Sequence, residues 1–151
     1  MNKSGLACDI DSKLRLSPAT PRDAALLLQW RNDPETRAAS KSDAPVTAEE
    51  HAQFMAKWTT RNGREGLFLL LADGEPVGTG RIEYLNPTTC QLSYCIAPAA
   101  RHQGYGVQLV RLLATQAQRW GYATVACRIK RGNTASLICA MQGGVNSVQL
   151  I

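Results

Sequence analysis

The sequence predicts a single α/β domain with a mixed, mostly antiparallel sheet flanked by helices. Three observations support this fold class. The 151 residues are 44% hydrophobic, which suits one domain with a real core. Strand-like segments are interspersed with segments whose apolar residues recur at helical spacing. Short turns join the three strand segments in the middle, which favours antiparallel neighbours, and no repeat, low-complexity segment or linker divides the chain.

The first third is predicted to form a strand and two helices. Residues 13–19 alternate in character, as a strand does. A helix then begins at Thr20-Pro21, because threonine can cap a helix and proline suits its first position. Asn32-Asp33-Pro34 breaks this helix, and a capping box at residues 47–50 starts the next one. We expect residues 1–12 to be a flexible N-terminal segment and residues 13–151 to form the domain.

Three antiparallel strands follow. Two apolar runs within residues 66–85 flank Asp73-Gly74, a hairpin signal. Asn86-Pro87 makes another turn before a third strand that includes residues 89–98.

The last third alternates helices and strands. A helix follows the glycines at 104 and 106 and stops at Gly121; then come a strand in residues 122–131, a short helix in 133–142 and a last strand in 145–151. The apolar stripe of the longer helix consists of Val110, Leu113, Ala117 and Trp120.

Composition narrows the partners. The formal net charge of +5 favours an anionic partner, but the basic residues are scattered, so we expect no nucleic-acid binding. No segment approaches the roughly 20 apolar residues that span a membrane, and the N-terminus lacks an apolar signal region. Five cysteines without a CxxC pair, beside two histidines, predict free thiols and no metal site. We expect a cytoplasmic protein that is a monomer or a homodimer.

The segment Arg101–Gly106 carries the clearest chemical signal. It places a basic stretch and two glycines at the start of a helix. A helix start offers unpaired N–H groups and a positive dipole end, glycine lets a phosphate approach the backbone, and arginine adds a fixed charge. These parts favour a diphosphate. A dinucleotide fingerprint would need glycine where Leu109 stands, and no Gly-Lys-Ser/Thr phosphate loop is present. An ordinary turn remains the alternative for the glycines alone.

The surroundings of this turn resemble the GNAT superfamily of acetyltransferases. The pattern Arg-x-x-Gly-x-Gly follows "SYCIAP" and precedes "NTAS" one strand later. The resemblance covers residues 13–151 in element order, and it implies the acyl-CoA N-acyltransferase fold with acetyl-coenzyme A (acetyl-CoA) as cofactor. It implies coenzyme contacts at Cys95, Ile96, Ala97, Arg101, His102, Gln103, Gly104, Tyr105, Gly106, Asn133 and Ser136.

The chemistry implied by the resemblance is attack of a neutral amine on a thioester. Glu83 is the best candidate for the base, with an exposed strand carboxylate as its alternative. Tyr94 is a second catalytic candidate that could instead line the core. Many relatives have a tyrosine where Ala140 stands, and some have a glutamate where Gln91 stands, so both roles are vacant here or served elsewhere. A nucleophilic role for Cys95 is not favoured.

The acceptor is predicted from residues 30–58. Their pattern resembles a GNAT branch that acetylates nucleotide-linked amino sugars. The resemblance implies substrate contacts at Arg31, Asn32, Arg37 and His51, and a small-molecule amine acceptor. Alternatives are RimL-like protein or peptide N-terminal acetylation, an antibiotic acceptor, and a catalytically silent coenzyme-A-binding module.

Overall fold

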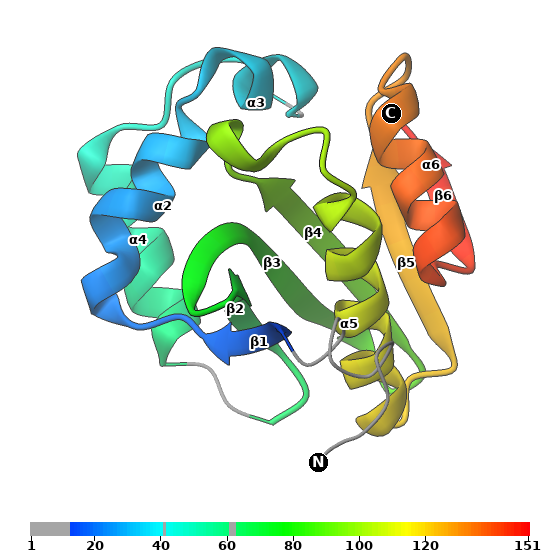
Figure 1. Cartoon of the computed structure of the whole chain (residues 1–151). Coiled ribbons are helices and arrows are strands. Elements are labelled where there is room, and N and C mark those ends of the chain that lie inside the picture. Colours follow the sequence, from blue (N-terminus) through cyan, green and yellow to red (C-terminus); the bar gives the residue numbers. More distant parts are fainter. Residues whose placement is uncertain (1–12, 41, 61–62) are drawn as a thin grey trace.

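A computed structural model describes residues 13–40, 42–60 and 63–151 (Figure 1). The expected flexible segment 1–12 lies outside the described residues. The strands are β1 (Leu14–Pro18), β2 (Gly66–Ala72), β3 (Glu75–Asn86), β4 (Thr89–Ile96), β5 (Thr124–Ile129) and β6 (Ser147–Leu150). The α-helices are α2 (Ala24–Arg31), α3 (Pro34–Ala39), α4 (Ala48–Thr59), α5 (Tyr105–Arg119) and α6 (Thr134–Gly143), with short 3-10 turns η1 (Pro21–Asp23) and η2 (Pro98–Ala100).

The strands form one sheet in the order β1-β2-β3-β4-β5-β6. The pairs from β1 to β4 are antiparallel, whereas β4–β5 and β5–β6 are parallel. Helices α5 and α6 lie on one face of this sheet and α2 and α4 on the other (Figure 1). This arrangement confirms the predicted fold class.

Local sequence signals account for most element boundaries. Thr47 and Glu50 form the predicted capping box of α4, and Gly121, at φ +92°, follows the end of α5. The hairpin between β2 and β3 has Asp73 and Gly74 both at positive φ, as a tight type I′ turn requires. The short helix α3 is an addition that the sequence analysis missed: Asp33 caps it by accepting a hydrogen bond from the Thr36 amide at 3.2 Å.

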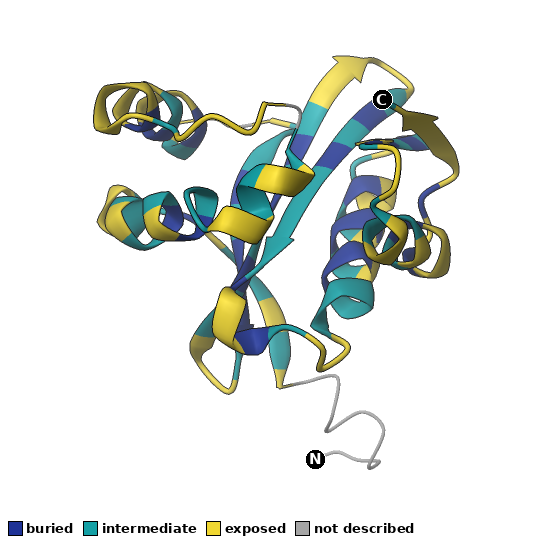
Figure 2. Cartoon of the chain, turned by 90° about the horizontal axis from the view of Figure 1, so that it is seen from above, coloured by how far each residue is buried: buried dark blue, intermediate teal, exposed yellow. Residues whose placement is uncertain are grey.

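The core has two layers because side chains alternate across the sheet. On β2, Leu70 belongs to the α5 layer, whereas Leu69 and Leu71 belong to the α2–α4 layer with Trp30 and Trp58. Viewed from above, buried segments concentrate on the sheet and on the helix sides that face it (Figure 2).

Among the described residues, no helix has both the length and the apolar character needed to cross a bilayer. No group of three or more potential metal-ligating side chains is found in that part of the chain. Cys90, Cys95, Cys127 and Cys139 are free thiols, as predicted, while Cys8 lies outside the described residues.

Candidate active site

A fork in the sheet opens between β4 and β5. The two strands pair only from Thr89↔Thr124 to Leu92↔Cys127, whereas β4 stays paired with β3 as far as Ile96. The strand end carrying residues 93–96 therefore has one edge that β5 does not cover. Such an edge is a template for hydrogen bonding by an extended, amide-bearing ligand.

The ladder decides which backbone groups face this fork. Ala97 donates its N–H to the Val77 carbonyl of β3 at 2.9 Å. Because backbone groups in an antiparallel pair point alternately to either side, those of Cys95 also face β3. Those of Tyr94 and Ile96 then face the fork. The predicted stretch of Cys95, Ile96 and Ala97 is thus at the right place, but Tyr94 and Ile96 carry the open donors and acceptors.

The turn after β4 leads directly into the start of α5. His102 has φ +64° and Gly104 has φ +84°, both in the left-handed region. A non-glycine residue there is uncommon and is enriched at functional sites. Gly104 is the N-cap of α5 and provides no side-chain cap for the helix amides. The first N–H groups of α5, beginning with Tyr105, are thus suited to receive an anion.

Close contact between α5 and α6 fixes the helix start in place. A Cβ on Gly106 would lie 2.7 Å from the Cys139 sulfur, so only glycine permits this approach. Asn133 caps α6 by accepting a hydrogen bond from the Ser136 amide at 3.1 Å. Asn133 is thus the N-cap of α6, and Ser136 lies in the first turn of this helix.

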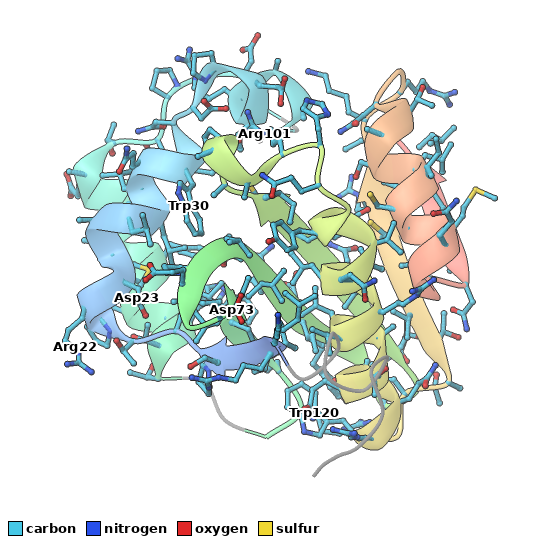
Figure 3. The ribbon with its side chains drawn as sticks, in the orientation of Figure 1. Arg22, Asp23, Trp30, Asp73, Arg101 and Trp120 are labelled. Atoms are coloured by element: carbon cyan, nitrogen blue, oxygen red, sulfur yellow. The ribbon has the colours of Figure 1, made fainter. Side chains whose placement is uncertain are left out.

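The Arg101 guanidinium is bound by acidic side chains from α3 and its cap. It lies 2.8 Å from Asp33 Oδ2 and 2.9 Å from Glu35 Oε2, and it donates to Thr36 Oγ1 at 2.9 Å. The hydrogen bond from Arg101 holds the pKa of Asp33 below its usual value. Arg101 thus ties the start of the turn to α3 (Figure 3). These partners of Arg101 were not predicted, because no residue near Arg101 in the sequence indicates them.

The other side chains of the turn make fewer contacts. His102 and Gln103 are exposed, and the Gln103 amide reaches the Ala99 carbonyl only at 3.5 Å.

The two predicted catalytic residues lie on opposite faces of the sheet. Tyr94 pairs with Gly80, whose missing Cβ makes room for Leu113 of α5, so Tyr94 faces the α5–α6 layer. Glu83 lies on the other face, two residues from Arg81, which stacks on α4. The β4 backbone at the fork therefore runs between them.

Tyr94 is held by α6. Its hydroxyl donates to the Ser136 carbonyl at 2.8 Å and lies 3.0 Å from Ser136 Oγ. Burial raises the pKa of Tyr94 far above its usual value, so the phenol stays protonated at neutral pH. This side chain reaches the turn of α6 that precedes Ala140, a residue fully buried in the core.

Glu83 is partly exposed and pairs across the sheet with Gln91. Its Oε1 lies 3.9 Å from the nearest nitrogen of Arg81. Arg81 in turn donates to Ser93 Oγ at 3.3 Å and stacks on the Trp58 ring, with 4.9 Å from Cζ to the ring centroid. The sequence analysis did not predict a role for Arg81, because its contacts with Ser93 and Trp58 join elements that are distant in the sequence.

Cys95 lies on the same face as Ser93, beside α3. Its sulfur is 3.6 Å from Thr36 Oγ1. Burial raises the pKa of the Cys95 thiol, which favours the neutral form and disfavours a nucleophilic role.

The four predicted acceptor residues do not come together. Asn32 binds the backbone of Val46 twice, at 2.7 and 2.9 Å, and Arg37 donates to the Asp43 carbonyl at 3.0 Å in an exposed position. His51 is only 6% exposed, and its Nε2 lies 2.7 Å from the Ala24 carbonyl, so it joins α4 to α2. Arg31 lies at the end of α2, and its charge is a small influence that lowers the pKa of the Cys95 thiol, against the larger effect of burial, which raises it.

A family comparison agrees with this geometry. The family model described as "Acetyltransferase (GNAT) domain" matches residues 13–146. The chain belongs to the GNAT acetyltransferase family. Comparison with curated protein sequences gives no match at a significant level.

Solved GNAT structures share the fold. Aminoglycoside acetyltransferase AAC(6')-Ib with coenzyme A and kanamycin is 19% identical, with a TM-score of 0.72 over 87% of this chain and 83% of that one. A putative phosphinothricin N-acetyltransferase is 22% identical, with a TM-score of 0.74 over 87% and 82%. The GNAT domain of S. lividans PAT is 17% identical, with a TM-score of 0.70 over 87% and 80%. These TM-scores show that the structures share one fold.

Proposed function

We propose that this GNAT protein transfers an acetyl group from acetyl-CoA to a primary amine on a small molecule. The observation that carries the proposal is the alignment of two backbone features along one path. The unpaired edge of β4 at Tyr94 and Ile96 leads to the uncapped, positive end of α5 at Gly104. AAC(6')-Ib has been crystallised with acetyl-CoA in the same fold, which supports this choice of cofactor.

The residues fit two parts of such a coenzyme, its diphosphate and its amide-bearing arm. The amides from Gly104 to Gly106 suit the diphosphate, and the turn formed by Arg101, His102 and Gln103 delivers the chain to them. The edge groups of Tyr94 and Ile96 suit the amide-bearing arm. Asn133 and Ser136 lie beside the path at the start of α6, with the side-chain oxygen of Asn133 already used as a cap.

Bound acetyl-CoA would supply a thioester that accepts the amine. On the α4 face, Glu83 can take the proton that the amine loses, directly or through a water. The outward N–H groups of Tyr94 and Ile96 can donate to an oxygen that gains negative charge. On the opposite face, the phenol of Tyr94 stays protonated, and it can give its proton to the departing sulfur only when its hydroxyl leaves the Ser136 carbonyl. The amine thus enters from the α2–α4 side, and the β4 backbone separates the base from the acid.

Acetyl transfer can be measured as release of free thiol from acetyl-CoA with a panel of amino-sugar nucleotides, amino acids and N-terminal peptides. We expect turnover with a small-molecule amine. Preferential turnover of peptides would support the RimL-like alternative, and coenzyme binding without any turnover would support a silent module.

The base assignment needs its own test. Glu83→Gln should lower kcat by about 10²-fold or more while leaving the calorimetric affinity for coenzyme A unchanged. Glu49→Gln, an exposed change on α4, is the matched control and should keep full activity. An unaltered kcat in Glu83→Gln would mean that Glu83 is not the base.

A further inference from the structure

Two arginines on the acceptor side hold buried N–H groups that no described residue accepts. These are Nη1 of Arg31 and Nε of Arg81. Buried donors in folded proteins are almost always hydrogen-bonded, because an unpaired one keeps its full desolvation cost. An arginine left in this state calls for a ligand or ordered water that completes it.

Among the described residues, three other arginines have partners for their guanidinium groups. Arg101 is bound by two carboxylates, Arg64 donates to the carbonyls of Pro87 and Trp120, and Arg37 donates to a carbonyl. Within the part of the chain that the structure describes, Arg31 Nη1 and Arg81 Nε are the buried side-chain nitrogen or oxygen atoms that lack a hydrogen-bond partner.

The two arginines lie along one stretch of β4. Arg81 contacts Ser93. Arg31 lies two residues before Asp33, the cap of α3. Thr36 of that helix lies 3.6 Å from the sulfur of Cys95, the next residue on the same face of the strand. Arg31 is the last residue of α2 and follows the buried Trp30, so the helix end is anchored in the core (Figure 3). The pair thus flanks the path by which the proposed amine would reach the fork.

We propose that Arg31 and Arg81 together bind an anionic group of the acceptor, so that the acceptor is an amine that also carries a carboxylate, phosphinate or phosphate. This inference rests on the proposed function and specifies its substrate class. A planar guanidinium matches such anions by two parallel hydrogen bonds. Glu83 lies near Arg81 and remains on the side from which the amine arrives.

The unpaired N–H groups of Arg31 and Arg81 favour some classes of acceptor over others. A polycationic aminoglycoside would bring further positive charge to two arginines whose buried N–H groups need acceptors, and it would leave them unpaired. An amino acid would offer its carboxylate, and a nucleotide-linked amino sugar its diphosphate. The shared chemistry is an amine joined to an oxyanion, and the two sources differ in size and in distance between the groups.

The test is calorimetry on the full chain saturated with coenzyme A. The probes are L-glutamate, phosphinothricin and a nucleoside-diphosphate amino sugar, with glutamate dimethyl ester as the neutral comparator and kanamycin as the polycation. We expect at least one anionic amine to bind at least about tenfold more tightly than the ester and kanamycin. The amino-acid and nucleotide probes distinguish the two sources of the anion.

Arg31→Met and Arg81→Met should each weaken that binding by at least about tenfold, and Arg31→Lys should weaken it less, since charge remains but the planar fork is lost. Arg22→Met removes the same charge from an exposed residue that points away from the site (Figure 3) and should leave affinity unchanged. Unchanged coenzyme A binding and thermal unfolding would show that the variants are folded.

The inference is overturned if the ester or kanamycin binds as tightly as the anionic amines, or if Arg31→Met and Arg81→Met match Arg22→Met. These outcomes differ from failure of the proposed function. Acetylation of neutral amines alone would refute the anion site and keep the acetyltransferase. Binding of an anionic amine that depends on Arg31, without any thiol release, would keep the anion site and refute catalysis.

Discussion

The two faces of the sheet build their halves of the candidate site from different material. On the α5–α6 face, backbone amides, two left-handed residues and a glycine contact form the proposed coenzyme path, and the amides and left-handed residues lie within a short stretch of chain. On the α2–α4 face, side chains from α2, α3, β3 and β4 converge, and the Arg101–Asp33 pair joins residues 68 positions apart. A site made of backbone groups keeps its hydrogen-bonding groups when side chains are substituted. A site made of side chains changes its specificity with each substitution.

This difference matches what each half has to do. One cofactor can be held by geometry that every chain of the fold can provide, since N–H groups are present at any helix start. Acceptors vary: solved structures of the same fold include an aminoglycoside acetyltransferase with kanamycin and a putative phosphinothricin N-acetyltransferase. Substitutions should therefore separate into those that abolish coenzyme binding and those that alter the acceptor.

The largest effect is expected at the backbone half, from Gly104→Glu. Its φ of +84° is costly for glutamate, and the carboxylate would repel a diphosphate at the start of α5. Because a Cβ at this position meets nothing within 4 Å, the fold should survive. We expect coenzyme A affinity to fall by about 100-fold or more, measured by calorimetry.

Gly104→Asn is the matched control, because asparagine adopts left-handed backbone with little cost and adds no charge. It should keep coenzyme affinity within about threefold. Equal affinities for Gly104→Glu and the wild type would remove the diphosphate from this turn.

A smaller effect, on stability, is expected where α6 supports the backbone half. A Cβ on Gly143 would overlap with Val110 Cγ1, which belongs to a fully buried side chain of α5. Gly143→Ala should lower the free energy of unfolding by about 1–3 kcal/mol, although alanine normally favours a helix. Gln142→Ala, an exposed change on the same helix, should stay within about 0.5 kcal/mol in the same denaturant titration. A higher free energy of unfolding in Gly143→Ala would mean that α5 and α6 can move apart enough to accept the added methyl group.

Local signals explain how much of the fold could be predicted from the sequence. The Thr47 capping box, the Asp73-Gly74 hairpin and the strands on either side of it depend on neighbouring residues, and the structure confirms them. The helix α3 was not predicted because it has only six residues, and the Asn-Asp-Pro sequence at its start signals the end of α2. The parallel pairing of β4 with β5 had no local signal, since a crossover helix separates them.

The candidate site divides in the same way. The turn from Arg101 to Gly106 could be found from its glycines, because their role is local. The partners of Arg101 and the position of Arg81 depend on contacts between distant elements, which a single sequence does not disclose. His51 shows the converse: the resemblance of its segment implied a substrate contact, and the packing of α4 on α2 buries its ring.

The smallest effect is expected for the link between the halves, the Arg101–Asp33 ion pair, and it should depend on pH. Because Arg101 lowers the pKa of Asp33 in the folded chain, the pair stabilises the fold fully above the unfolded carboxyl pKa of about 4. That contribution is lost as the pH falls through the lower, folded-state pKa. Arg101→Met should therefore lower Tm at pH 7 by no more than about 4 °C, and the difference from wild type should shrink below about pH 4.

Differential scanning calorimetry of both proteins between pH 7 and pH 3 measures this convergence, with Arg22→Met as a control that should show no such trend. A Tm difference that stays constant down to pH 3 would mean that Asp33 is not the partner through which Arg101 stabilises the fold. Convergence would show that α3, on the acceptor side, is fastened to the coenzyme turn by a charge that titrates. The two halves would then respond together to acid, although they are built from different parts of the chain.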